Sequence, residues 1–147
     1  MSYKKFSLML LISFMIMYAV MFLNITQVDY FYVSTTRIYM ALLMISPMAV
    51  VMMLMMGKMY PNKKLNTGII VSAIIVFIIT LAGLRTQTPI GDVQYMKAMI
   101  PHHSSAILTS ENANIKDPEV RKLADGIIEA QKREIAEMKA LIQKLRK

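Results

Sequence analysis

The sequence predicts an all-α membrane protein in which three transmembrane helices precede an extracytoplasmic, antiparallel helical hairpin. Hydrophobic residues make up 56% of the 147 residues, more than is typical of a soluble domain. The apolar residues gather in three long runs, and all but seven of the Asp, Glu, Lys and Arg residues lie from Arg85 onward. This charged half has the periodicity of amphipathic helices.

The apolar half, residues 1–84, is expected to be a membrane anchor. Its three runs contain no Asp, Glu, Lys or Arg, and as helices each is about as long as the hydrocarbon layer is thick. We expect helices at residues 6–23, 38–57 and 68–84. The first run resembles a signal peptide, but it is too long and lacks a small-x-small cleavage site, so we expect an uncleaved anchor.

Basic residues in the short loops predict the orientation. Lysines precede the first span and fill the second loop, whereas the loop at residues 24–37 has one Arg against one Asp. Because cytoplasmic loops carry the excess of Lys and Arg, we expect a cytoplasmic N-terminus in the bacterial inner membrane and a periplasmic C-terminal half. Tyrosines near the ends of the spans suit the two interfaces of the bilayer: Tyr30, Tyr32 and Tyr39 outside, Tyr3 and Tyr60 inside.

The second apolar run carries a methionine stripe at helical spacing: Met40, Met44, Met48, Met52 and Met56. Methionine is a flexible apolar filler, so packing against lipid or other helices explains the stripe. A path for a soft monovalent metal is the alternative. The spans lack the ionisable residues that ion pathways use, so an independent transporter is not expected.

After a linker at residues 85–90, residues 91–147 are expected to form the hairpin. Its first helix should run from Asp92 to about Asn112, although Pro101 would kink it or mark a later start. The second should begin at Asp117, an N-cap candidate, and continue to the C-terminus. An apolar stripe is expected on its buried face: Leu123, Ile127, Ala130, Met138, Leu141 and Leu145.

The first hairpin helix carries both histidines of the chain beside two methionines. Helical spacing places Met96, Met99 and His103 on one face, with His102 at its edge. Thioethers select Cu(I), and imidazole binds copper in either oxidation state. The chain has no cysteine, which excludes disulfides, zinc fingers, iron–sulfur clusters and thiol catalysis. Surface or hydrogen-bonded histidines are the alternative.

Folding the hairpin about residue 115 predicts which residues of the second helix meet this cluster. Met99 then faces Gln131 and Met96 faces Glu134, with Met138 one turn further along. Glu134 lies in the apolar stripe, where a carboxylate is costly unless it is paired or bound to a cation. A Lys, Arg or His partner for Glu134 is as good an explanation as a metal.

Three motifs occur together in the charged half: Met-x-x-Met-Ile-Pro-His-His-x-x-Ala at 96–106, Asp-Pro-Glu-Val-Arg-x-Leu-Ala at 117–124, and Ala-Gln-x-x-Glu-Ile-x-x-Met at 130–138. Over about residues 92–145 the chain resembles a bacterial, ferritin-like domain-of-unknown-function family that includes the periplasmic copper-binding protein CopM. The resemblance implies copper association, with these ligands: Met96, Met99, His102, His103 and Met138. Gln131 and Glu134 would be further ligands or would orient them.

Relatives that bind copper often carry more Met and His or a second copy of the domain, whereas this chain has one copy. Because two helices make a thin core, we expect homo-oligomerisation, with a dimer completing a four-helix bundle. The expected function is copper storage, delivery or tolerance without catalysis. Cu(I) is favoured over Cu(II), Ag(I) would be a mimic, and a copper-trafficking partner is expected.

A structural or interaction module that binds no metal is the competing hypothesis. A di-iron oxidase has little support, because the chain contains no Glu-x-x-His motif. The net charge of +8 does not indicate nucleic-acid binding, since part of it lies in the loops that flank the bilayer.

Overall fold

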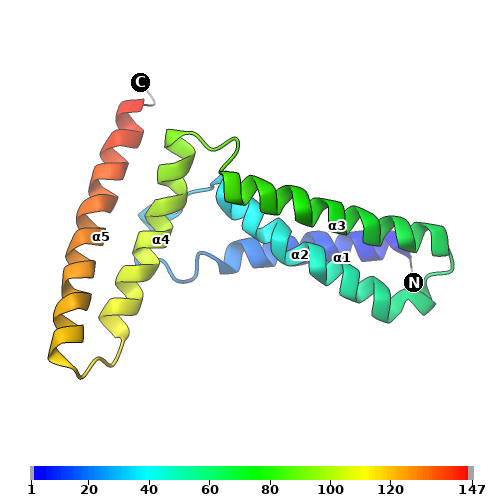
Figure 1. Cartoon of the computed structure of the whole chain (residues 1–147), viewed down its shortest axis with the longest axis horizontal. Coiled ribbons are helices and arrows are strands. Elements are labelled where there is room, and N and C mark those ends of the chain that lie inside the picture. Colours follow the sequence, from blue (N-terminus) through cyan, green and yellow to red (C-terminus); the bar gives the residue numbers. More distant parts are fainter. Residues whose placement is uncertain (1, 146–147) are drawn as a thin grey trace. The chain divides into compact units, whose positions relative to one another are not determined.

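The computed structural model describes residues 2–145, which form helices and connecting segments without any strand. The all-α prediction is therefore confirmed for this part of the chain. Two compact units are present (Figure 1). The membrane unit consists of Met1–Met21 and Thr36–Pro89, and the hairpin unit consists of Phe22–Thr35 and Ile90–Lys147.

Three helices build the membrane unit: α1 (Tyr3–Val20), α2 (Thr35–Met56) and α3 (Lys63–Thr86). The short 3₁₀ helix η2 (Gly57–Met59) follows α2. All three long helices have the length and composition needed to cross a membrane, as the sequence predicted. The third begins five residues earlier than expected, because the side chain of Asn62 caps it by accepting a hydrogen bond from the Leu65 amide at 3.1 Å.

The N-terminal ends of α1 and α3, whose first turns contain lysines, lie together. The Tyr3 hydroxyl donates to the Asn66 Oδ1 at 2.8 Å, and the Tyr3 and Tyr60 rings are 5.0 Å apart between centroids. Phe6, Met53 and Tyr60 form the buried cluster beneath these contacts. The start of the chain and the second loop are therefore on one side of the bundle, as the orientation prediction requires.

Two antiparallel helices build most of the hairpin unit: α4 (Asp92–Asn112) and α5 (Pro118–Leu145). The expected cap is confirmed, because Asp117 Oδ1 accepts hydrogen bonds from the amides of Glu119 and Val120 at 2.9 and 3.0 Å. Helix α4 continues through Pro101, which is fully buried, so the expectation of a later start is not met. The core contains Met96, Ile100, Ile107, Ile135 and Ile142.

The segment between α1 and α2 completes this core, which the sequence did not predict. It contains the 3₁₀ helix η1 (Val28–Tyr30), and the Tyr30 and Tyr32 rings pack against the core cluster. The amide of Thr26 donates to the buried Ser104 Oγ at 2.7 Å. These two tyrosines therefore have a packing role within the hairpin unit, where a place in an aromatic belt was expected.

The face of α5 that packs on α4 differs from the predicted stripe. Ala124, Ile135 and Ile142 are buried, whereas Leu123 is 65% and Leu145 is 53% exposed. The apolar arc of α5 is wider than one neighbouring helix can cover. We call the uncovered part the open stripe, and it consists of Leu123, Ile127, Ala130, Leu141 and Leu145.

The cap of α5 yields a stability prediction. Asp117→Ala leaves two first-turn amides without their acceptor and should lower the free energy of unfolding of the hairpin by about 1 kcal/mol. Asp125→Ala is the matched control, because it removes only an exposed i,i+4 pair with Arg121, worth about 0.5 kcal/mol or less. Thermal unfolding followed by circular dichroism would compare them, and equal losses would contradict the cap.

Candidate metal centre

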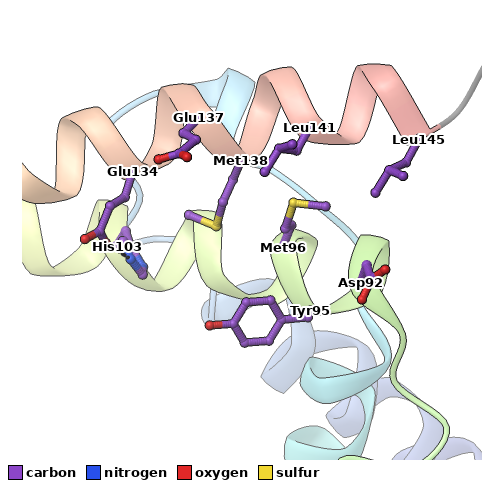
Figure 2. Close-up of a pocket in the computed structure, with 9 residues that line it drawn as sticks. All are labelled: Asp92, Tyr95, Met96, His103, Glu134, Glu137, Met138, Leu141 and Leu145. Atoms are coloured by element: carbon purple, nitrogen blue, oxygen red, sulfur yellow. Dashed lines mark hydrogen bonds and ion pairs between the residues drawn. The ribbon is translucent and has the colours of Figure 1, made fainter.

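An open groove of about 460 Å³ runs between α4 and α5 (Figure 2). Four residues that the sequence predicted as ligands or orienting groups line it: Met96, His103, Glu134 and Met138. The other lining residues are Asp92, Tyr95, Glu137, Leu141 and Leu145. The groove therefore joins two thioethers, one imidazole and three carboxylates within a single chain.

His103 is the most constrained side chain in the groove. It is 8% exposed, its Nδ1 lies 2.9 Å from the carbonyl oxygen of Met99, and its Nε2 lies 2.7 Å from Oε2 of Glu134. A carbonyl can only accept, so the Nδ1–H must donate to Met99. That bond fixes the ring and turns Nε2 toward Glu134, so one nitrogen is held by α4 and the other faces α5.

The contact between His103 and Glu134 requires a proton between two atoms that would otherwise both be acceptors. With Nδ1 donating to the backbone, the second bond forms when the imidazole is doubly protonated or when the carboxyl group is protonated. A metal ion on Nε2 would replace that proton, since a metal ligand must offer a lone pair. The pair is therefore a site where proton and metal compete.

The two methionines approach the groove from opposite helices. Figure 2 shows Met96 extending from α4 and Met138 extending from α5 into the space between them, with Met138 next to His103 and Glu134 and Met96 further along the groove. Met96 is 6% exposed and belongs to the core, whereas Met138 is half-buried and packs against that core. Thioether sulfur and imidazole nitrogen thus line the same groove.

Three further hairpin residues that the sequence singled out are placed differently. Met99 is half-buried and contributes its carbonyl to His103, but it is not among the residues that line the groove. His102 is exposed, with its ring centroid 6.2 Å from that of His103. Gln131 lines a second shallow groove on α5, beside Leu123 and Ile127.

The pairing between the two helices corrects the expected register. Folding about residue 115 opposed Met96 to Glu134, but the residue that meets Glu134 is His103. Each Cα–Cβ bond tilts toward the N-terminus of its own helix, so side chains lean away from the turn on α4 and toward it on α5. Contacting residues in an antiparallel pair therefore have higher numbers than the midpoint of the turn implies.

The methionine stripe of α2 lies beside the buried face of that helix. Ala41, Ile45, Ala49 and Met53 form the buried face at a spacing of four residues. Met40 and Met44 are 43% and 46% exposed, whereas Met48, Met52 and Met56 are half-buried. The stripe thus lies at the edge of the helix bundle, where packing against lipid or other helices was expected.

Two carboxylates of the groove, Asp92 and Glu137, were missed by sequence reasoning. Their spacing was the available signal, since Glu137 follows Glu134 by three residues and Asp92 precedes Met96 by four. Within residues 2–145, no three His, Asp or Glu side chains are close enough to hold a metal by themselves. A metal in the groove would need sulfur ligands or groups from outside this chain.

Comparison with known proteins gives the family. Residues 81–147 match the family described as a domain of unknown function (DUF305). The "Uncharacterized protein L153" of Acanthamoeba polyphaga mimivirus is 41% identical over 106 residues, which cover 71% of this chain and 68% of that protein. The chain belongs to the DUF305 family.

The DUF305 match begins near the end of α3 and contains the whole of α4 and α5. The similarity to the viral protein is longer than the DUF305 match, so it extends beyond the DUF305 segment of the chain. No solved structure matches this chain. The family inferred from the three motifs is thus confirmed at the level of the DUF305 domain, whose description carries no activity.

The His103–Glu134 contact leads to a second stability prediction. Glu134→Ala leaves the mostly buried His103 without its partner on α5 and should lower the free energy of unfolding by about 1 kcal/mol. Glu137→Ala removes a carboxylate one turn further along α5, outside the His103–Glu134 contact, and should stay within about 0.5 kcal/mol of wild type. Chemical unfolding of the full chain in detergent measures both, and an unchanged Glu134→Ala would contradict the role of the pair.

Proposed function

We propose that this DUF305 protein is a membrane-anchored copper-binding protein that stores, delivers or sequesters copper outside the cytoplasm. The observation that carries the proposal is the groove that Met96, Met138 and His103 all line. Two thioethers and one imidazole form a ligand set that favours Cu(I) over harder cations. Thioethers also retain their lone pairs at every physiological pH, so only His103 would bind in competition with protons.

The hydrogen bond from Nδ1 to the Met99 carbonyl supports this assignment. Histidine ligands usually donate their second ring N–H to a carbonyl or carboxylate, which fixes the tautomer and aims the other nitrogen at the metal. His103 is held in this way, with Nε2 on the groove side. Copper would take the place of the proton between Nε2 and Glu134, and the 46% exposed Glu134 side chain has room to adjust to it.

Charge near the groove favours a cation over an anion. Asp92, Glu134 and Glu137 line it without any Lys or Arg among the lining residues. Carboxylates at the mouth of a site raise the local concentration of positive ions and speed their entry. The surroundings therefore complement a positively charged ligand although the chain as a whole has a net charge of +8.

The structure also supports the expected arrangement of the chain across the bilayer. Residues 22–35 and α4–α5 pack as one unit, so both must lie on the same side of the membrane. One crossing by α1 and two by α2 and α3 satisfy this requirement. We assign that side as extracytoplasmic because the basic residues Lys4, Lys5 and those of the second loop belong to the opposite side.

A module that assembles without metal is the second candidate, and the His103–Glu134 pair favours it. At 2.7 Å this pair already gives His103 and Glu134 a partner within the chain. Helix α5 also retains an apolar surface suited to assembly. Leu123 and Leu141 are exposed, and the residue that follows each of them is buried. Successive residues of an α-helix are about 100° apart around its axis, so the open stripe is rotated by about that angle from the face that packs on α4. Helices of a four-helix bundle have two neighbours at about this angle.

Copper titration of the full chain in detergent tests the proposed function. His103→Gln, Met96→Leu and Met138→Leu should each weaken Cu(I) binding at least about tenfold, because each removes one donor of a small set. A chromophoric Cu(I) chelator in competition with the protein measures the affinity, and Ag(I) serves as a redox-inert probe.

Two matched variants control this titration. His102→Gln and Met99→Leu alter the same residue types outside the lining of the groove, and they should bind Cu(I) within about twofold of wild type. A triple variant that combines Met96→Leu, His103→Gln and Met138→Leu gives the non-specific level of Cu(I) binding. If the wild-type protein binds Cu(I) no more tightly than this variant, the copper proposal is rejected and the metal-free module remains.

The orientation has its own test, made simple by the absence of cysteine. Ser2→Cys and Lys122→Cys each introduce a single thiol at an exposed position on opposite sides of the membrane unit's spans. A membrane-impermeant maleimide should label Lys122→Cys on intact cells, and Ser2→Cys only after permeabilisation. The reverse pattern would show that the hairpin is cytoplasmic.

A further inference from the structure

The open stripe of α5 has a symmetry that its individual residues do not reveal. Its members lie at matched distances on either side of Glu134, with Met138 at the edge of the stripe completing the set. Ala130 and Met138 are each four residues from Glu134, Ile127 and Leu141 are each seven, and Leu123 and Leu145 are each eleven. A helix surface with this arrangement is self-complementary about one point, which is the requirement for an isologous two-fold contact.

Two copies of α5 can meet along this stripe in an antiparallel or a parallel sense, and side-chain sizes favour the antiparallel one. An antiparallel pair centred on Glu134 sets the small Ala130 against the large Met138 of the second copy, and Leu123 against Leu145. A parallel pair sets Ala130 against Ala130 and leaves a gap there, which close-packed interfaces avoid.

Charges at the rim favour the same direction. Arg133 and Glu137 are exposed and lie four residues apart, on either side of a point next to Glu134. Antiparallel pairing keeps Arg133 and Glu137 of both copies on the same flank of the contact, so Glu137 lies near Arg133 of the second copy. Parallel pairing places the charges of the two copies on opposite flanks and forms no such pair. Opposite charges across an interface fix its register.

The two-fold axis would bring the incomplete metal sites of the two chains together. Each chain has one imidazole and one carboxylate in contact, His103 and Glu134, at the level of the axis. Two half-exposed Glu134 side chains that face each other in an apolar seam repel unless each is neutralised by the proton that it shares with His103 or by a cation between them. Two imidazoles and two carboxylates supply four donors, the number that one hairpin lacks.

We propose that a second copy of this chain covers the open stripe in the antiparallel sense, and that one copper ion is held at the two-fold axis by His103 and Glu134 of both copies. Met96 and Met138 flank this shared site. The copper part of this inference rests on the proposed function, whereas the pairing rests on the stripe alone. Oxygen and nitrogen donors from two chains would let the site hold Cu(II) as well as the Cu(I) that thioethers prefer.

Disulfide trapping tests the pairing, because a chain without cysteine can form only the bridges that are engineered into it. Leu123→Cys and Leu145→Cys, carried by differently tagged copies of the full chain and co-expressed, should give mixed disulfide dimers under mild oxidation. Leu123 and Leu145 are both exposed, so neither change should disturb folding. A disulfide forms only when the two Cα atoms come within about 7 Å.

The trapping experiment has a matched control and clear contrary outcomes. Ala136→Cys places an exposed thiol on the far side of α5 and should give no dimer. Leu123→Cys trapping itself would show parallel pairing, and no dimer from any variant would show that the stripe is not covered by a second copy. Either result overturns the proposal.

Metal stoichiometry tests the shared site separately. Full-length protein loaded with Cu(II) and desalted should retain about one ion per two chains, and Glu134→Gln should lose most of it while still giving the mixed disulfide. One ion per chain would leave copper binding in place but overturn the shared site. Mixed disulfides without bound copper would overturn the shared site, whereas the copper function stands or falls on the Cu(I) titration.

Discussion

A buried imidazole whose two nitrogens both need partners is the constraint on which the hairpin unit depends. His103 meets it by using the backbone of its own helix on one side and Glu134 of α5 on the other. The contact fixes the register of α4 against α5, and it aligns Met96 and Met138 on the same groove. Replacing the shared proton by a metal would keep the geometry and change the charge, which is why one arrangement can serve both folding and binding.

Much of this arrangement could be predicted from the sequence. Uncharged apolar runs identify α1, α2 and α3, and Asp117 followed by Pro118 marks the start of α5. The choice of His103, Glu134, Met96 and Met138 also came from spacing and residue type, and all four line one groove. These features depend on short stretches of chain, where periodicity and capping chemistry determine the outcome.

The rest depended on contacts between distant segments. The predicted register of α4 against α5, which placed Met96 opposite Glu134, was wrong because it did not include the tilt of side chains toward the N-terminus of each helix. The stripe assigned to the buried face of α5 is the one left open, because a wide apolar arc does not say which half meets the nearest helix. Nor did the segment around Thr26 show any sign of packing on Ser104, since its only signals were turn residues and two tyrosines.

That segment has a consequence for how the protein is made. The hairpin helices are joined by a short turn and can associate as soon as both have been synthesised, whereas Thr26 must find Ser104 across 78 positions of chain. Contacts that close such long loops form late in folding. The Thr26–Ser104 contact can therefore form only after α2 and α3 have been inserted. A fully folded hairpin unit thus requires that the whole anchor has already reached its membrane topology.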